Sequence, residues 1–307
     1  MWLADRWRDY EVLDCSGGEK LERWGSYVLV RPDPQVIWNS PKTHGGWKNP
    51  NGIYHRSDKG GGSWEIRDLP QEWSISYDTA QPARPLTFRL KPFQFKHTGL
   101  FPEQAANWDW FMPLIQAETK RRKNTDPVRV LNLFAYTGGA TAAAGMAGAV
   151  TTHVDASKGM VGWAKENYAA SGLERVPARF LVDDCAKFVQ REIRRGKTYD
   201  AVILDPPSYG RGPGGEVWKL EDCIYDLLKL IREVVSDRPL FFLLNSYTTG
   251  LQPLVLRDLV SLTLAAGHGG RIEADELALP VTGDPAGGSS DARLILPCGA
   301  SARWSAH

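Results

Sequence analysis

The chain has 307 residues and a formal net charge of +1 at pH 7. This length predicts two domains, or one large domain with an extension. The near-zero charge weighs against the strongly basic character of many nucleic-acid-binding proteins, although a local patch could still bind RNA. No run of 18 apolar residues occurs, so no transmembrane helix is expected, and the charged N-terminus lacks the apolar core of a signal peptide.

Four widely separated cysteines, Cys15, Cys185, Cys223 and Cys298, form neither a CxxC pair nor another metal-ligand spacing. A metal site is therefore not expected. Reduced thiols are typical of proteins in a reducing compartment, so we expect a cytoplasmic protein.

Residues 1–92 are predicted to form a small, mostly β domain. Short runs that are apolar or alternate with polar residues are typical of strands, and glycines and prolines mark the loops between them. The expected strands are 10–14, 24–32, 73–77 and 86–91.

Seven of the twelve tryptophans precede residue 74. Trp38, Trp47, Trp64 and Trp73 could form a base-stacking surface for a nucleic acid. We favour the alternative that they pack the core, because a small domain needs large side chains to bury enough apolar area.

Residues 93–127 are expected to connect the two zones. Residues 98–104 are rich in side chains that can hydrogen-bond or stack, and 107–120 are predicted to be a helix. The basic run 120–123 is interpreted as a solvated helix end, where cations complement the helix dipole.

Residues 128–307 alternate between strand and helix patterns, which predicts an α/β domain with a mainly parallel sheet. The expected strands are 128–134, 151–155, 178–182, 199–205 and 239–245, and the expected helices are 138–148, 158–170, 185–195, 217–235 and 251–266. Residues 271–279 and 292–297 are then expected to form two consecutive strands without a helix between them. Such strands would pair antiparallel at the end of the domain. Gly172 follows the second helix, where a left-handed cap favours glycine.

Acidic or glycine-rich signals follow each of the first four strands of this domain. Ligands of open α/β sheets bind at the edge formed by the carboxyl ends of the parallel strands, which is where these residues are expected to lie. The first strand ends in a turn with two glycines, and Asp155 follows at close to the ~20 residues expected for a ribose-binding acid. Asp184 follows the third strand, where a carboxylate can accept from an adenine amino group, and Asp205 follows the fourth. Taken singly, an acidic residue at such a position is more often a helix N-cap than a ligand contact. Asp184 could simply cap the helix that starts at Cys185.

The turn after the first strand fits neither Gly-x-Gly-x-x-Gly nor a Walker A loop. A small cationic ligand with an adenosine part suits three carboxylates better than a polyphosphate does. These residues therefore point to S-adenosylmethionine.

Residues 131–139, 153–157, 182–184 and 204–209 resemble motifs of the S-adenosylmethionine-dependent methyltransferases related to the large-subunit (23S) ribosomal RNA methyltransferases. Residues 98–104 resemble the segment that this family carries before its catalytic domain. The resemblance implies a Rossmann-like class I methyltransferase domain, with a mainly parallel seven-stranded sheet and an antiparallel last strand. The N-terminal zone looks like a short form of the family's middle β domain, with no room for its separate RNA-binding module.

The resemblance also implies roles for residues at matching positions. The turn from Phe134 to Gly139 would cradle the methionine part, Asp155 would hold the ribose, and Asp184 with the backbone of Cys185 would read the adenine. The implied cofactor-binding residues are Gln104, Phe134, Ala135, Tyr136, Thr137, Gly138, Gly139, Asp155, Ala156, Ser157, Asp184, Cys185 and Asp205. Gln104, in the connecting segment, would close over the cofactor.

The implied catalytic residues are Asp205, Pro206, Pro207 and Tyr209. In family members that methylate base nitrogens, the carboxylate and a proline carbonyl accept from the target amino group, and an aromatic ring stacks on the base. Cytosine-5 members use a cysteine, commonly just after the fifth strand, but 245–250 contain none. We therefore expect direct transfer, to nitrogen, without a covalent intermediate.

An RNA methyltransferase, with ribosomal RNA as the expected substrate, is the leading hypothesis. The alternative is a methyltransferase for a small molecule or a protein side chain. A cofactor-binding protein without activity is disfavoured by the intact 205–209 segment. The loop 210–215 is either a lid or a connector, and the sequence leaves the oligomeric state open, a homodimer included.

Overall fold

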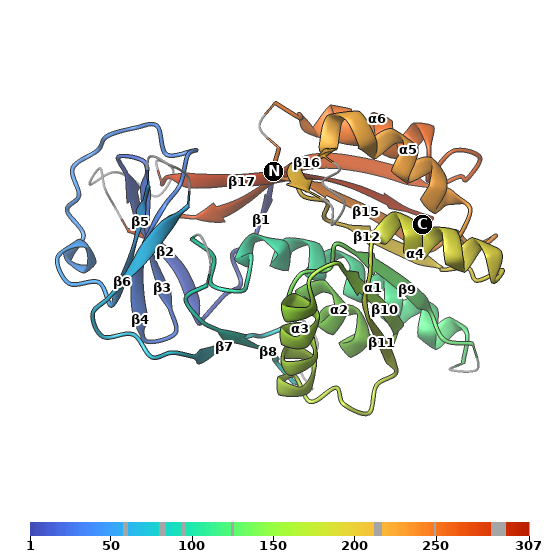
Figure 1. Ribbon diagram of the computed structural model, residues 1–307, viewed down its shortest axis with the longest axis horizontal. Helices are drawn as coiled ribbons and strands as arrows, with labels where there is room; N and C mark the ends of the chain where they lie inside the picture. Colours follow the sequence, from blue (N-terminus) through green and yellow to red (C-terminus); the bar gives the residue numbers. More distant parts are fainter. Residues whose placement is uncertain are drawn as a thin grey trace. The chain divides into compact units, whose positions relative to one another are not determined.

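A computed structural model describes residues 1–57, 61–79, 84–93, 96–123, 126–211, 217–248, 250–283 and 293–306. The chain forms two compact units (Figure 1). The α/β unit comprises Met1, Asn107–Glu276 and Gly299–His307, and the β unit comprises Trp2–Ala106 and Leu277–Cys298. The division at residues 92 and 127 stays a prediction.

The α/β unit is built on a mixed sheet with a parallel centre. The strand order is β1-β16-β17-β15-β12-β9-β10-β11. These strands are β1 (Trp2–Leu3), β9 (Arg129–Leu133), β10 (Val150–Asp155), β11 (Ala178–Val182), β12 (Ala201–Leu204), β15 (Phe241–Ser246), β16 (Arg271–Pro280) and β17 (Ile295–Ser305). The strands from β15 to β11 pair in parallel, and β17 runs antiparallel to β15. The seven strands from β16 to β11, with β17 antiparallel to β15, form the Rossmann-like arrangement that the sequence predicted. The eighth strand, β1, pairs in parallel with Leu277 and Ala278 of β16, which belong to the β unit.

Helices cover both faces of this sheet. They are α1 (Ala105–Arg121), α2 (Gly139–Met146), α3 (Lys158–Ala170), α4 (Cys185–Arg194), α5 (Leu220–Arg232) and α6 (Pro253–Leu262). α4, α5 and α6 lie on one face, and α2 and α3 lie on the other (Figure 1). α5 buries Leu220, Ile224, Leu227, Leu228 and Ile231, one helical face against the sheet. None of the described helices is long and apolar enough to cross a membrane.

The expected helix at 217–235 is wrong at its start. Residues Val217–Lys219 form strand β14, which pairs antiparallel with β13 (Tyr209–Arg211), and α5 begins only at Leu220. Valine and tryptophan favour strands, and the pairing with β13 decides the matter. Gly210 and Arg211 of the suggested lid belong to this hairpin, whereas its residues 212–215 lie outside the described part of the chain.

The β unit contains a five-stranded sheet and a two-stranded one. The larger sheet has the order β2 (Tyr10–Ser16), β3 (Glu19–Trp24), β4 (Tyr27–Pro32), β5 (Gly52–Arg56) and β6 (Gly62–Ile66), and the smaller pairs β7 (Trp73–Tyr77) with β8 (Leu86–Leu90). The predicted strands at 10–14, 73–77 and 86–91 are confirmed. A single strand at 24–32 is wrong, because Gly25 with φ 65° reverses the chain between β3 and β4.

The tryptophans of the β unit have internal partners. The indole N–H groups of Trp38, Trp47 and Trp64 donate to Cys15 O, Asp14 Oδ2 and Phe93 O, at 2.7–3.0 Å. Trp73 is buried and packs edge-on against Tyr27. These contacts support core packing over a base-stacking surface for these rings.

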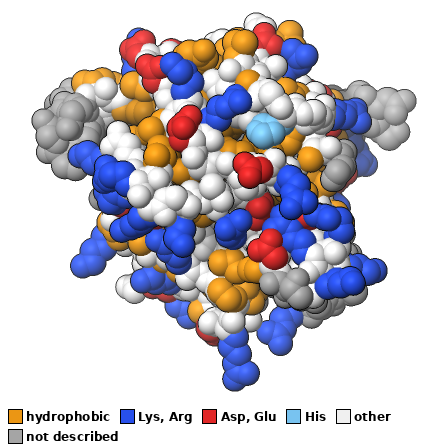
Figure 2. Space-filling view, turned by 90° about the vertical axis from the view of Figure 1, so that its right-hand side faces the viewer, with side chains coloured by type: hydrophobic (Ala, Val, Ile, Leu, Met, Phe, Trp, Pro, Cys, Tyr) orange, Lys and Arg blue, Asp and Glu red, His pale blue; other side chains and the backbone are white. Residues whose placement is uncertain are grey.

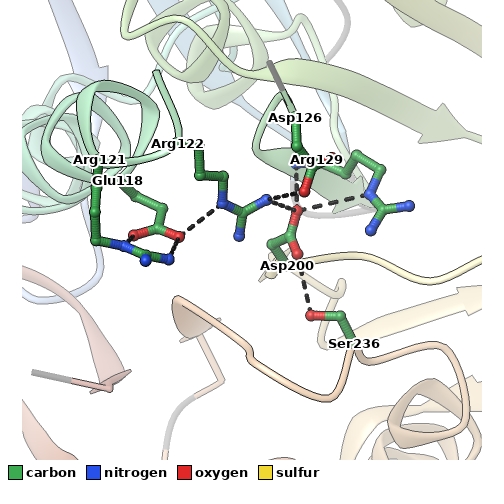
Figure 3. Close-up of polar contacts among 7 residues, drawn as sticks. All are labelled: Glu118, Arg121, Arg122, Asp126, Arg129, Asp200 and Ser236. Atoms are coloured by element: carbon green, nitrogen blue, oxygen red, sulfur yellow. Dashed lines mark hydrogen bonds and ion pairs between the residues drawn. The ribbon is translucent and has the colours of Figure 1, made fainter. Parts of the chain in front are cut away.

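Ion pairs join the end of α1 to the sheet edge where the parallel strands begin (Figure 3). Glu118 pairs with Arg121 and Arg122, at 2.6 and 2.7 Å. Arg122 also reaches Asp200, which precedes β12, at 3.3 Å, and Asp200 accepts the main-chain N–H of Arg129 in β9 at 2.8 Å. The basic run is thus a helix end, as expected, but Arg122 lies largely buried in ion pairs rather than solvated.

Candidate functional site

The registers of the parallel strands bring the predicted motifs to one edge. Leu133 at the end of β9 lies opposite Val154 of β10 and opposite Leu204 of β12. Asp155 in turn lies opposite Val182 at the end of β11. The segments that follow these strands, which carry the glycine turn and the acids at 155, 184 and 205, therefore leave the sheet side by side.

The turn after β9 has an unusual backbone. Phe134, Tyr136 and Gly138 all have positive φ, at 55°, 50° and 82°. This conformation is costly for aromatic residues, by about 1–3 kcal/mol each, and such strain concentrates at functional sites. Gly138 also leaves no room for a side chain, because a Cβ there would lie 2.9 Å from Cβ of Ala164. The chain therefore maintains a compact turn immediately before α2.

Asp155 ties this turn to β10. Its carboxylate accepts the main-chain N–H groups of Tyr136 and Ser157, at 2.9 and 2.8 Å. Burial raises the pKa of the Asp155 carboxyl, and the two backbone hydrogen bonds partly oppose that rise. Ala156 and Ser157 are exposed, and the Ser157 hydroxyl caps α3 by accepting from Met160 N–H. Asp155 thus presents a hydrogen-bonded, half-buried carboxylate beside the turn.

Cys185 and Asp184 occupy the start of α4. The Asp184 carboxylate accepts from Lys187 N–H at 2.8 Å, so it caps the helix, the alternative role that the sequence left open. The Cys185 sulfur lies 3.4 Å from the main-chain nitrogen of Phe134, which donates to it. Burial raises the pKa of this thiol to about 12, so it is protonated at neutral pH.

Buried polar side chains form hydrogen bonds next to the turn and with its backbone. The Asn132 amide donates to the Thr141 hydroxyl at 2.9 Å, and Thr141 lies 3.0 Å from Nδ1 of His153. Asn167 of α3 donates to the Thr137 carbonyl at 2.8 Å. Burial lowers the pKa of His153 to about 3, so this ring is a neutral structural group rather than a proton carrier.

The Asp205-Pro206-Pro207 segment follows β12 directly and is held on several sides. Asp205 N–H donates to the Leu133 carbonyl at 3.4 Å, beside the glycine turn. The indole N–H of Trp218 donates to the Pro207 carbonyl at 2.6 Å. Thr248, after β15, donates to the Ser208 hydroxyl at 2.8 Å.

Trp218 and Thr248 are site residues that sequence reasoning missed. The signal for Trp218 was present, since a glycine- and proline-rich turn between two short β-prone runs indicates a hairpin. Thr248 gave no such signal, because its contact with Ser208 depends on the neighbouring positions of β12 and β15.

Tyr209 and Gln104 are the remaining predicted residues. Tyr209, in the β13–β14 hairpin, is 55% exposed, so its ring is available to a partner. Gln104 ends the short 3₁₀ helix Pro102–Gln104 in the β unit and is buried. Its role over the cofactor stays a prediction.

Comparison with known proteins supports one family. Residues 72–248 match the family model described as S-adenosylmethionine-dependent methyltransferase. A solved structure of a methyltransferase of this kind from Agrobacterium tumefaciens is 35% identical, covers 98% of this chain and 91% of that chain, and has a TM-score of 0.85. A methyltransferase structure from Streptococcus mutans has a TM-score of 0.66 at 16% identity, over 97% of this chain and 76% of that one, a likeness of fold alone.

Curated relatives carry ribosomal RNA names. Ribosomal RNA large subunit methyltransferase K/L of Pseudoalteromonas atlantica is 40% identical over 48% of this chain and 19% of its own length. Ribosomal RNA large subunit methyltransferase K of Neisseria meningitidis is 33% identical over 43% of this chain and 37% of its own length. The chain thus spans a minor part of each relative. The family match covers more than half of the chain, and the protein belongs to the S-adenosylmethionine-dependent methyltransferases, with a class I Rossmann-like fold and S-adenosylmethionine as its cofactor.

Proposed function

We propose that the protein methylates RNA, with ribosomal RNA as the first candidate, by direct transfer to a base nitrogen. The observation that carries this proposal is the Asp205-Pro206-Pro207 segment, which is hydrogen-bonded to the strand that ends in the glycine turn. The names of the curated relatives favour ribosomal RNA as the substrate class.

The residues of the turn fit the cofactor. Glycine at 138 keeps the backbone free of a side chain at the turn, and α2 begins there with N–H groups that have no partner within the helix. Asp155 would accept from the ribose hydroxyls, and Asp184, next to Cys185, would accept from the adenine amino group. Bound S-adenosylmethionine supplies an electrophilic methyl group on a sulfonium. The carboxylates at 155, 184 and 205 suit that positive charge.

Asp205 and its prolines are the groups that we assign to the target. A base amino group must lose a proton as it gains a methyl group, and a carboxylate can accept hydrogen bonds from it throughout. The Pro207 carbonyl already accepts from Trp218, so we assign the Pro206 carbonyl as the second acceptor. Tyr209 would stack on the base. Positioning and exclusion of water then supply most of the rate enhancement.

No cysteine is proposed as a nucleophile. Covalent attack on a base carbon needs a thiolate. The Cys185 thiol is buried, protonated and in contact with the Phe134 N–H, and Cys223 lies within α5. These positions favour a structural role for both thiols.

The charge distribution is compatible with an RNA partner. The net charge is only +1, yet Figure 2 shows one face on which Lys and Arg side chains are widely spread, with fewer Asp and Glu side chains among them. Phosphate contacts by such side chains would make binding strongly dependent on salt. A cytoplasmic location and a homodimer stay predictions.

The test is incubation of the full chain with methyl-labelled S-adenosylmethionine and separated total RNA, protein and metabolite fractions. We expect label in RNA, in an N-methylated base after digestion. The matched variant is Asp205→Asn, which keeps the size of the side chain but lacks the carboxylate and should transfer little label. Label confined to protein or metabolites would refute the RNA proposal and favour the alternative substrate classes.

A further inference from the structure

We infer that Trp218 is a positioning residue that couples the cofactor turn to the Asp-Pro-Pro segment. This inference rests on the proposed function. Trp218 lies on β14, in the hairpin that follows the Asp-Pro-Pro segment. In β14 its neighbours Val217 and Lys219 are exposed, whereas Trp218 is half-buried. Because side chains alternate along a strand, Trp218 occupies the inward face of the hairpin.

Trp218 makes one contact with each part of the site. Its indole N–H donates to the Pro207 carbonyl at 2.6 Å. Its ring lies 5.7 Å from the ring of Phe134, between centroids, at an interplanar angle of 41°. Phe134 is the first residue of the turn with positive φ. One side chain thus joins the element that would hold the methyl donor to the element that would hold the acceptor.

The contact with Pro207 has a large effect because two prolines leave the segment few free torsions. Each proline fixes its own φ near −65°, and a residue before proline is held in extended conformations. The direction of the Pro207 carbonyl is then set mainly by the ψ of Pro207, which the hydrogen bond from Trp218 fixes. Ser208 is held next, through Leu220 N–H to its carbonyl at 3.1 Å and Thr248 to its hydroxyl.

The contact with Phe134 would let cofactor binding at the turn affect Trp218. The Phe134 backbone is strained, and its N–H group is held by Cys185 Sγ. We expect a cofactor that binds in the turn to shift the Phe134 ring, and a shifted ring would change the surroundings of the Trp218 indole. We therefore expect cofactor binding to be detected at Trp218 and passed to the Pro207 carbonyl.

The test uses the full chain with ¹⁵N-labelled tryptophan indoles, titrated with S-adenosylhomocysteine. The Trp218 Nε1–H resonance is assigned by its loss in Trp218→Phe, which keeps a ring against Phe134 but cannot donate to Pro207. We expect this resonance to shift on titration, with the same saturation as the heat of binding. A resonance that stays fixed while calorimetry reports binding overturns the coupling alone. Absence of binding heat overturns the cofactor site itself and the coupling with it.

Kinetics separate positioning from a purely structural role. Trp218→Phe should lower kcat for methyl transfer to total RNA by about 5- to 10-fold, the scale of one hydrogen bond, with the KM for S-adenosylmethionine unchanged. Val217→Ala, on the exposed face of the same hairpin and 55% exposed, is the matched control and should leave both constants unchanged. An equal loss in both variants, or a changed KM with unchanged kcat in Trp218→Phe, would contradict the inference.

Discussion

The Asp155 carboxylate accepts a hydrogen bond from the main-chain N–H of Tyr136, with 2.9 Å between nitrogen and oxygen. The same side chain therefore shapes the turn and, in our proposal, holds the ribose. Asp155→Ala should weaken S-adenosylmethionine binding by about 1.5–3 kcal/mol, the scale for hydrogen bonds to a charged group. Isothermal titration calorimetry measures this directly. An unchanged dissociation constant would remove Asp155 from the cofactor site.

Cofactor affinity should also depend on pH through Asp155. Burial raises the pKa of this carboxyl in the folded protein, so protonation begins at a higher pH than for an ordinary aspartate. A protonated carboxyl cannot accept from both ribose hydroxyls. Calorimetric affinity should be constant above the raised pKa and should fall as the pH is lowered through it. Asp155→Asn should flatten this part of the profile.

Gly138 is expected to be sensitive even to alanine. Its φ of 82° strains any side chain, and a Cβ would lie 2.9 Å from Cβ of Ala164. Gly138→Ala should lower the free energy of unfolding by more than about 1 kcal/mol and weaken cofactor binding. Gly162→Ala, on helix α3 with open space around the position, is the control and should be neutral or slightly stabilising. Urea denaturation of both variants checks the contrast.

Glu22 in the β unit should dominate the acid sensitivity of that unit. It is fully buried and accepts from Arg31 at 2.6 and 2.8 Å and from the Tyr10 hydroxyl at 2.7 Å. Burial alone would raise the pKa of Glu22, but Arg31 and Lys20 outweigh it and lower the pKa to about 2. Because the folded pKa lies below the unfolded value, this stabilisation is present above about pH 4.3 and is lost as the pH falls toward 2.

Replacement of Glu22 measures that contribution. Glu22→Gln should lower the free energy of unfolding at pH 7 by about 3–5 kcal/mol, because it leaves Arg31 as a buried, unpaired charge. Glu11→Gln, which breaks the half-exposed pair of Glu11 with Arg23, should cost no more than about 1 kcal/mol. The difference between wild type and Glu22→Gln should shrink as the pH falls. A difference that is constant from pH 7 to pH 3 would contradict the assignment.

The thiols should be dispensable for chemistry. Cys185→Ser and Cys223→Ser should retain methyl transfer, and neither variant nor the wild type should form a covalent adduct with RNA, detected by denaturing gel electrophoresis. Loss of transfer together with a trapped adduct in either variant would establish covalent catalysis and refute direct transfer. Cys185→Ser has a structural effect to control for, since the sulfur accepts from Phe134 N–H, so its melting temperature is measured in parallel.

Local patterns were enough for the parallel strands and most helices of the α/β unit. Strand β11, an edge strand with partly exposed side chains, and helix α3 have the predicted bounds, because each is a continuous run of residues between turn signals in the sequence. The same patterns failed at β3. That strand buries Glu22, whose charge conceals the apolar alternation until Arg31 is known to lie beside it.

The sequence by itself determined the family, the cofactor and the order of the motifs along the chain, since each motif is a short run of adjacent residues. Only the tertiary structure decided which residues meet. It paired Tyr209–Arg211 with Val217–Lys219, which turned a predicted helix start into a strand, and it placed Trp218 between Phe134 and Pro207. These contacts depend on strand register and hairpin pairing, and the contact of Trp218 with Phe134 also joins residues far apart in the sequence, so local composition does not specify them.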